Sequence, residues 1–326
     1  MTKITILVSS AGRRVALIEC FRESARAAGL ELEVLACDIE PALSAACQAA
    51  DRALPVPRCD DPRFIETLLE IAQRFGVDLL VPTIDPELMP LSVAADRFAA
   101  IGTQVHVSPP ATIEIVRDKL RTAQVLGAAN VPVPRTASLE AARAMASDFD
   151  WPAFVKPAGG SASRGIRIVQ SPSQLPHGTE EPMILQQLLK GPEYTVNMFV
   201  DRDGELRSAV AHQRLRIRAG EVEKGRTKRH PVFRELAEGI LRAMPQMRGV
   251  LCFQVIDDPQ AGPMVFEINA RFGGGYPLAH RAGAEFTRWL LEETAGLPSR
   301  MHDDWLSDVL MLRYDAAFFP TQTVQL

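Results

Sequence analysis

The chain has 326 residues, with 36 Lys and Arg against 40 Asp and Glu and a formal net charge of −4. At roughly 100–200 residues per domain, this length allows two or three domains. The hydrophobic share of 47% and the charged share of 23% are typical of a soluble globular protein and exclude global disorder. The acidic balance disfavours a protein that neutralises nucleic-acid phosphates.

No apolar run approaches the roughly 20 residues that span a bilayer, so we expect no membrane segment. The apolar run at residues 4–8 is also too short for the core of a secretory signal. The five cysteines form no CxxC pair and no Cys/His group with zinc spacing, which predicts reduced thiols. Together these features predict a cytoplasmic protein.

The first hundred residues alternate apolar segments with amphipathic ones. We expect strands at 4–8, 32–36, 78–81 and 105–107, and helices at 13–28, 64–75 and 87–101. This alternation indicates a parallel sheet covered on both faces. Ligands of such sheets gather at the carboxyl ends of the strands, where this sequence has Ser9, Ser10, Arg13, Asp38 and Asp85.

Pro109 and Pro110 interrupt this pattern and mark an expected domain boundary. Beyond it we expect a helix capped by Thr112, then a strand that leads into a loop rich in glycine and serine. After residue 185 the pattern changes to strands and hairpins. The expected division of the chain is therefore 1–110, 111–185 and 186–326.

Residues 154–165 read FVKPAGGSASRG and combine a strand end, a lysine and a glycine-rich loop. Backbone N–H groups of such a loop can surround phosphate oxygens, because glycine puts no side chain in the way. Lys156 would add a positive charge to the same phosphates. The loop is neither GxxxxGK[ST] nor GxGxxG at a strand-to-helix turn, so a flexible surface turn is an equally good interpretation.

The segment FEINAR has Glu267, Asn269 and Arg271 at alternate positions. In a strand these side chains would share one face. Carboxylate and amide oxygens beside a guanidinium suit Mg²⁺ bound to phosphates. If the hairpin turns near residues 260–261, Gln254 falls opposite Glu267 and supplies a third oxygen. An ordinary solvated face is the alternative.

Residues 186–195 read QQLLKGPEYT, a strand end that turns through Gly191 and Pro192 into a second strand. Backbone groups exposed at such a turn can hydrogen-bond an adenine edge. Glu193 would accept hydrogen bonds from ribose hydroxyls, as acidic residues do in other nucleotide sites. By itself the segment is also consistent with a simple hairpin.

In this order the segments resemble the ATP-grasp superfamily: Asp118–Lys119, VKP with its glycine loop, QQLLxGPEYT, Gln254 and EINAR. The continuation FGGGYPL after Arg271 looks most like stand-alone, single-copy relatives of the carbamoyl-phosphate synthetase large subunit. The resemblance covers essentially the whole chain. It implies a fold of α/β and α+β type, in which an ATP-grasp fold follows a Rossmann-like parallel-sheet domain.

The resemblance also implies a role for each matching residue. Arg271, with Lys156, would stabilise the transferring phosphoryl group. Magnesium, or manganese in its place, would be held by Gln254, Glu267 and Asn269. ATP would be bound by Lys119, Lys156, Gly159, Gly160, Ser161, Gly165, Gln186, Gln187, Leu189 and Glu193.

Two glutamines, Gln186 and Gln254, stand where many relatives have acidic residues. Glutamine at position 254 is the pattern of the carbamoyl-phosphate synthetase branch. In that branch a Gly-Glu-Val-x-Lys-Gly-Arg-Thr segment lies beside the active site, and residues 220–227 match it. The resemblance therefore implies that Arg226, and less firmly Lys224, binds a substrate carboxylate or phosphate, which a guanidinium suits.

The remaining polar candidates have two roles open to them. His212 is a candidate general base, although a single histidine is more often structural. Ser9, Ser10, Arg13 and Asp85 would either face the second substrate across the domain cleft or cap strand ends. The sequence does not choose between these roles.

The implied reaction is ATP-dependent, ADP-forming ligation of a small-molecule carboxylate to an amine, of amino-acid or peptide type, through an acyl phosphate. Carbamoyl-phosphate synthesis itself is disfavoured, because that enzyme needs two ATP-grasp halves and an ammonia supply. A small-molecule kinase and a nucleotide-binding module without turnover stay as alternatives. A dehydrogenase using Asp38 is a weaker one, since the first turn lacks the three-glycine fingerprint. A homodimer is expected from base rates alone.

Overall fold

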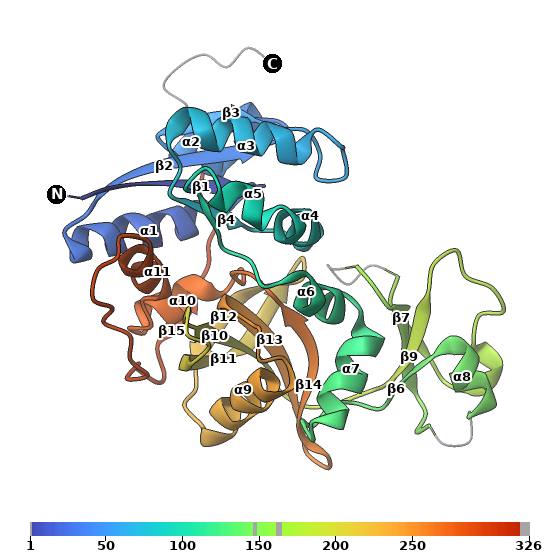
Figure 1. Ribbon diagram of the computed structural model, residues 1–326. Coiled ribbons are helices and arrows are strands. Elements are labelled where there is room, and N and C mark those ends of the chain that lie inside the picture. Colours follow the sequence, from blue (N-terminus) through green and yellow to red (C-terminus); the bar gives the residue numbers. More distant parts are fainter. Residues whose placement is uncertain (1, 146–148, 161–164, 320–326) are drawn as a thin grey trace.

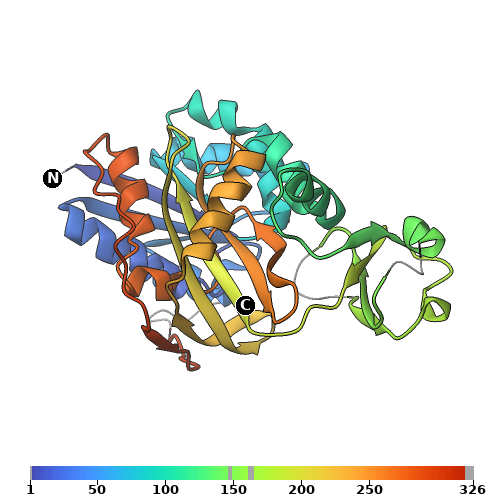
Figure 2. The ribbon, with the colours of Figure 1, turned by 90° about the horizontal axis from the view of Figure 1, so that it is seen from below.

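The computed structural model describes residues 2–145, 149–160 and 165–319. Within these residues the strands form a five-stranded, a six-stranded and a four-stranded sheet. Figures 1 and 2 show the four-stranded sheet projecting to one side, away from the other two sheets. The expected class, a parallel-sheet domain followed by an antiparallel-sheet fold, is confirmed.

The N-terminal sheet is parallel and has the strand order β3-β2-β1-β4-β5. Its strands are β1 (Lys3–Ser9), β2 (Glu31–Asp38), β3 (Arg52–Pro55), β4 (Leu79–Pro82) and β5 (Gln104–Val105). The helices are α1 (Val15–Ala28), α2 (Ala45–Ala49), α3 (Phe64–Phe75), α4 (Leu88–Val93) and α5 (Ala95–Ala99), with short 3₁₀ turns at η1 (Pro41–Leu43) and η2 (Asp85–Glu87). Glycines in left-handed conformation, Gly29 and Gly76, end α1 and α3.

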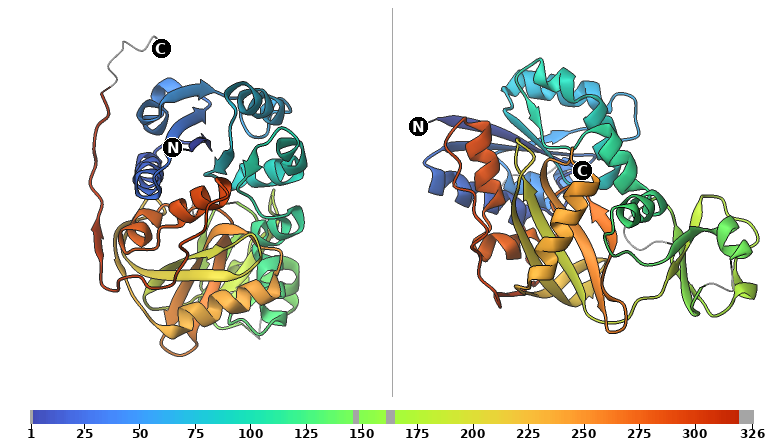
Figure 3. Two further views of the ribbon diagram at one scale, coloured as in Figure 1. Left: turned by 60° about the vertical axis from the view of Figure 1, so that its left-hand side comes forward. Right: turned by 60° about the horizontal axis from the view of Figure 1, so that its bottom comes forward.

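Strand β1 is buried on both faces, because successive side chains alternate. Ile6 and Val8 join a core that also contains Phe199 and Trp289, whereas Leu7 joins the core around Phe64. The first of these cores includes α10 (Tyr276–Arg281) and α11 (Phe286–Thr294), which lie between α1 and the six-stranded sheet in Figure 3. The N-terminal domain therefore shares a core with the end of the chain.

Two predicted helices differ from the structure. The helix expected at 87–101 is interrupted at Ala94, where the backbone leaves the helical conformation. The helix expected from Thr112 instead begins at Pro110, since proline is suited to the first helical position. It also divides into α6 (Pro110–Arg117) and α7 (Lys119–Ala128), because the Asp118 carboxylate accepts hydrogen bonds from backbone N–H groups of the next turn.

The six-stranded sheet is antiparallel, with the order β14-β13-β10-β11-β12-β15. Helix α9 (Pro231–Ala243) packs on one face through Phe233, Leu236 and Ile240. The other face carries the polar residues of the site. The strands are β10 (Glu193–Val200), β11 (Leu206–Arg218), β12 (Glu221–Thr227), β13 (Gly249–Asp258), β14 (Gly262–Asn269) and β15 (Leu310–Leu312).

The four-stranded sheet, with α8 (Leu139–Ala144) and the 3₁₀ turn η4 (Pro172–Gln174), is called the lid here. Its strand order is β6-β9-β7-β8, and every pair is antiparallel. The strands are β6 (Thr136–Ser138), β7 (Ala153–Pro157), β8 (Arg167–Val169) and β9 (Met183–Gln187). Strands β9 and β10 are consecutive but belong to different sheets, so the QQLLKGPEYT segment connects the lid to the large sheet.

Among the described residues no helix is both long and apolar enough to cross a membrane.

Candidate active site

A cavity of about 740 Å³ lies between the lid and the six-stranded sheet. Lid strands β7 and β9 contribute one wall and strands β10, β11, β13 and β14 the other. Ser161 lies outside the described residues, and neither Gly165 nor Arg226 lines the cavity. The other predicted site residues all line it: Lys119, Lys156, Gly159, Gly160, Gln186, Gln187, Leu189, Glu193, Gln254, Glu267, Asn269 and Arg271.

Two lysines face this cavity without a carboxylate partner within 4 Å among the described residues. Lys119, at the start of α7, donates to the carbonyl oxygens of Gly159 at 3.2 Å and Gly160 at 2.9 Å. The Lys156 ammonium lies 5.7 Å from the centre of the Phe266 ring. Burial lowers the pKa of Lys119 and lowers that of Lys156 to about 8. Their positive charge is therefore available to a polyanionic ligand.

The predicted metal ligands come together on β13 and β14. Gln254 is paired with Glu267 across the hairpin, which confirms the expected register. The Gln254 amide satisfies both of its neighbours in one orientation. In that orientation its nitrogen donates to Glu267 Oε2 at 3.0 Å and its oxygen accepts from Arg214 Nη1 at 2.8 Å. Turned over, the same amide would offer its oxygen beside Glu267 and Asn269. This set of oxygen donors fits Mg²⁺ or Mn²⁺.

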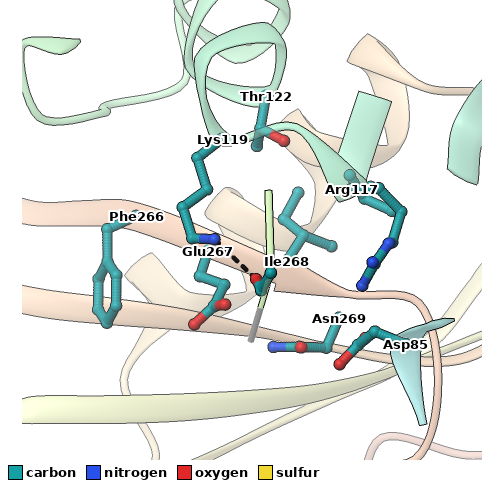
Figure 4. Close-up of a pocket in the computed structure, with 10 residues that line it drawn as sticks. Asp85, Arg117, Lys119, Thr122, Phe266, Glu267, Ile268 and Asn269 are labelled. Atoms are coloured by element: carbon teal, nitrogen blue, oxygen red, sulfur yellow. Dashed lines mark hydrogen bonds between the residues drawn. The ribbon is translucent and has the colours of Figure 1, made fainter. Parts of the chain in front are cut away.

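Figure 4 shows a crevice at the edge of the cavity, where Lys119 and Arg117 reach toward Glu267, Asn269 and Asp85. Arg117 belongs to α6, and the sequence did not single it out. Across the described residues no group of three or more His, Cys, Asp or Glu side chains could hold a metal. The oxygen donors at this place are one carboxylate, Glu267, and the amides of Gln254 and Asn269.

Arg271 lies just beyond the end of β14 and is held by three groups. Its Nη2 donates to Asp85 Oδ2 at 2.6 Å and to Asn269 Oδ1 at 3.1 Å, and its Nη1 donates to the carbonyl of Phe272. Burial opposes its charge, but the Asp85 carboxylate more than compensates and raises the pKa of Arg271. Asp85 thus contacts the predicted catalytic arginine, across the interface between the N-terminal domain and the large sheet.

A buried carboxylate, Glu87, lies two residues beyond Asp85 and holds the residues just before it. Glu87 accepts hydrogen bonds from the Ser9 and Ser10 hydroxyls at 2.6 and 2.9 Å, and from the backbone N–H groups of Thr83 and Ile84. Burial raises its pKa despite these bonds. Ser9 and Ser10 therefore join the ends of β1 and β4 to Glu87, which favours the strand-end role over the substrate-facing one.

The opposite part of the cavity contains the predicted ribose and adenine residues. Glu193 accepts a hydrogen bond from Arg214 Nη1 at 2.6 Å, and burial raises the pKa of Glu193 even though Arg214 lowers it. Gln187 accepts from the backbone N–H of Arg135 at 3.2 Å, while Gln186 donates to Thr136 at 2.9 Å. Arg214 is a lining residue that the sequence did not identify.

Arg226 lies apart from the other predicted catalytic residues, Arg271 and Lys156. Its side chain is 49% exposed and lies 3.8 Å from Asp308, outside the cavity. Lys224 also does not line the cavity, whereas Glu221 on the same strand does. The pairing of β11 with β12 is irregular near Arg216, so strict alternation does not predict which basic residue of this hairpin faces inward.

Two further candidates, His212 and Arg13, do not line the cavity. His212 is fully buried, and burial followed by the charge of Arg214 lowers its pKa to about 3, so it is neutral at physiological pH. Arg13 is exposed, whereas its neighbour Arg14 lines the cavity. Both arginines precede α1, and the helical pattern of the sequence does not distinguish which of the two faces the cavity.

Two family models match the chain: the PylC-like N-terminal domain over residues 6–106 and the ATP-grasp domain over residues 116–275. The chain therefore belongs to the ATP-grasp superfamily, as its motifs predicted.

Among curated proteins, it is 30% identical over 210 residues to the uncharacterized protein y4rH of Sinorhizobium fredii, covering 56% of this chain and 43% of that one. It is 31% identical over 152 residues to the D-alanine–D-alanine ligase of Marinobacter nauticus, covering 44% of this chain and 43% of that one. A stretch of 89 residues is 36% identical to the carbamoyl phosphate synthase large chain of Beutenbergia cavernae, covering 26% of this chain and 8% of that one. The chain thus spans less than half the length of these relatives.

A solved structure with a similar fold is the biotin carboxylase domain of the 2-oxoglutarate carboxylase of Hydrogenobacter thermophilus. The TM-score is 0.72 at 17% identity, over 93% of this chain and 72% of that chain. That structure is a domain dimer in complex with MgADP, ADP and bicarbonate. At this level of identity the likeness concerns the fold.

Proposed function

We propose that the protein is an ATP-dependent carboxylate–amine ligase that forms an acyl phosphate and releases ADP and phosphate. The observation that carries the proposal is one cavity with two kinds of group on facing walls. Lys119 and Lys156 bring unpaired positive charge, and Gln254, Glu267 and Asn269 bring oxygen donors. The D-alanine–D-alanine ligase among the relatives joins two amino acids, which favours the amino-acid type for this chain.

In this proposal the nucleotide lies between the lid and the large sheet. Lys119 and Lys156 bind its phosphates, Gln186, Gln187 and Leu189 surround its base, and Glu193 binds the ribose. Glu193 must then exchange part of its contact with Arg214, now 2.6 Å away, for the ribose hydroxyls. Mg²⁺ held by Gln254, Glu267 and Asn269 would neutralise phosphate charge.

The first chemical step joins a carboxylate to the γ-phosphate. A carboxylate oxygen forms a bond to the γ-phosphorus, the bond to the β–γ bridging oxygen breaks, and ADP leaves with that electron pair. Arg271, which lies beside Asn269, stabilises the charge on the transferring phosphoryl oxygens. In the second step an amine nitrogen attacks the acyl carbon, phosphate leaves, and the nitrogen loses a proton.

In this scheme each of the three expected parts of the chain has its own role. These parts are 1–110, 111–185 and 186–326. The second part covers the nucleotide, and the third supplies the metal ligands. The first supplies Asp85 and Arg14 at the place where the acyl phosphate forms. Exclusion of water there protects the acyl phosphate from hydrolysis. The homodimer and the cytoplasmic location stay predictions.

Product analysis tests the proposal. The purified protein is incubated with Mg-ATP and pooled amino acids, with and without added amines, and ADP, AMP and phosphate are resolved. We expect ADP and phosphate in equal amounts, dependent on two added compounds. ADP without free phosphate would indicate a small-molecule kinase, and AMP with pyrophosphate would contradict the mechanism. Binding of ATP without turnover in any pool would favour a regulatory module.

A further inference from the structure

One part of the cavity wall is not explained by nucleotide binding. It consists of Arg14 from the N-terminal domain, Glu221 from β12, Gly274 and Arg313, which we call the Glu221 cluster. Arg14, Glu221 and Gly274 line the cavity itself, together with Arg271. The four residues come from widely separated segments of the chain, so they are neighbours only in the folded protein.

The two arginines hold Glu221 with unequal strength. Arg313 Nη1 donates to Glu221 Oε2 at 2.8 Å, the length of a strong charge-assisted hydrogen bond. Arg14 Nη1 lies 3.4 Å from Glu221 Oε1, and its Nη2 donates to the Thr83 carbonyl at 3.4 Å. Arg14 is only 18% exposed, yet its two contacts are both long. Donors of Arg14 and one oxygen of Glu221 therefore remain for a ligand.

A glycine is required where the loop at position 274 packs against this ion pair. A Cβ atom on Gly274 would lie 2.7 Å from Glu221 Oε1 and 2.9 Å from Arg14 Nη1. Any side chain at this position would therefore collide with the ion pair, so glycine lets Arg14 and Glu221 line the cavity in this arrangement. The Gly274 carbonyl accepts a hydrogen bond from Arg313, which fixes the loop beside the cluster.

The charges of the cluster favour a ligand that carries both signs. A carboxylate can replace Glu221 as the partner of Arg14, while an ammonium replaces Arg14 as the partner of Glu221 Oε1. Every charge then stays paired in a poorly solvated site. A ligand with only one charge would leave either Arg14 or Glu221 Oε1 without a partner, at a cost in free energy.

We propose that Arg14 and Glu221 bind the carboxylate and the ammonium group of an amino acid, and that this amino acid is the carboxylate donor of the ligase. The assignment rests on the proposed function, because it identifies which substrate is phosphorylated. Arg271 lines the same cavity as Arg14, so an amino acid bound at the cluster shares the cavity with the arginine that is proposed to stabilise the transferring phosphoryl group. The amine held at Glu221 stays protonated and is therefore not the nucleophile.

Hydroxylamine trapping tests this without knowledge of the natural amine. The protein is given Mg-ATP, hydroxylamine and each proteinogenic amino acid singly, in both the L and D forms, and the aminoacyl hydroxamate is measured by mass spectrometry with ADP. The same is done with the N-acetyl derivatives and with simple carboxylic acids. We expect at least one amino acid to give hydroxamate, with kcat/KM at least about tenfold above that of its N-acetyl derivative, as for a lost charge-assisted hydrogen bond.

Variants connect that preference to the cluster. E221Q should raise KM for the amino acid about tenfold or more. It should also reduce the ratio of kcat/KM for the amino acid to kcat/KM for its N-acetyl derivative. R14Q should raise KM similarly, whereas R14K, which keeps the charge, should raise it less. Matched controls are E223Q, whose side chain pairs with Arg216 and Arg218, and R26Q near the other end of α1. Both controls should leave KM within about twofold.

Each contrary outcome has a distinct meaning. Hydroxamate from simple acids or N-acetyl derivatives but from no amino acid would overturn the assignment of the cluster and leave the ligase proposal standing. A preference for amino acids that E221Q and R14Q do not change would also overturn it. ADP formation without hydroxamate from any carboxylate would instead contradict the acyl-phosphate mechanism, and with it the proposed function.

Discussion

The two ends of the cavity handle charge in opposite ways. At the nucleotide end, Lys119 contacts backbone carbonyls and Lys156 lies over an aromatic ring, and neither forms an ion pair within 4 Å in the described part of the chain, although the charge of Glu267 acts on both. At the other end each guanidinium already has a carboxylate, with Arg271 beside Asp85 and Arg14 beside Glu221. The first arrangement suits a polyanion and the second a ligand that brings charges of both signs. Variants at each end and a pH titration can test this difference.

Removal of the carboxylate at the nucleotide end should have the largest effect. E267A deletes a predicted metal ligand next to Lys119 and Lys156, and we expect ADP formation to fall by at least about a hundredfold. Turnover by K156A should be lost as well. ADP release in the substrate pool that supports turnover is the measurement, with circular dichroism to show that the fold is intact.

The matched control for this change is E70A, which removes an exposed glutamate from α3. It should leave both turnover and nucleotide affinity unchanged. Wild-type rates in E267A would show that β14 does not supply the metal ligands.

At the other end, loss of a carboxylate should act on stability as well as on rate. D85A leaves Arg271 buried without its partner at 2.6 Å, so we expect the free energy of unfolding to fall by about 3–5 kcal/mol. D85N should be milder, because its amide oxygen can still accept from Arg271. Urea denaturation measures the first effect, and ADP formation by D85N measures how far Asp85 positions Arg271.

D85N should lower turnover by about tenfold to a hundredfold while ATP affinity stays close to that of the wild type. An equal loss of ATP affinity would mean that Asp85 belongs to the nucleotide end, and the contrast between the two ends would fail.

The same contrast explains what the sequence could predict. The nucleotide end is built from short segments in which alternation and a turn determine the geometry. Gln254 opposite Glu267 follows from the position of one hairpin turn. The Glu221 cluster depends on contacts between segments up to 299 residues apart, from Arg14 to Arg313. No local sequence pattern predicts such contacts. In addition, the pairing of β11 with β12 is irregular, so alternation along these strands does not predict which side chains face the cavity.

A pH titration should separate the two ends. With the pKa of Lys156 lowered to about 8 by burial, the lysine loses its charge as the pH rises through that value. ATP affinity of the free protein should then fall by up to about tenfold per pH unit above 8. K156R stays charged, so its affinity should be flat over the same range. Isothermal titration calorimetry with Mg-ATP measures both curves.

Stability should move in the opposite direction over that range. The unfolded chain keeps the lysine proton up to its ordinary pKa of 10.5, so between pH 8 and that value the unfolded state binds more protons. The contribution of Lys156 to the free energy of unfolding therefore rises with pH. An ATP affinity that stayed constant to pH 9.5 would mean that Lys156 does not contact phosphate.

The smallest expected effect is that of substituting Arg226. This substitution tests whether the substrate binds inside the cavity, which Arg226 does not line. Its side chain is about half exposed, and its nearest carboxylate, Asp308, is 3.8 Å away. Exposed pairs of this kind contribute little, so R226Q should change kcat/KM by less than about twofold. R214Q, on the neighbouring strand, should weaken ATP binding, because Glu193 loses its partner at 2.6 Å. If R226Q instead lowers kcat/KM more than R214Q does, the substrate lies along the outer face of β12. The Glu221 cluster would then be a structural contact between domains.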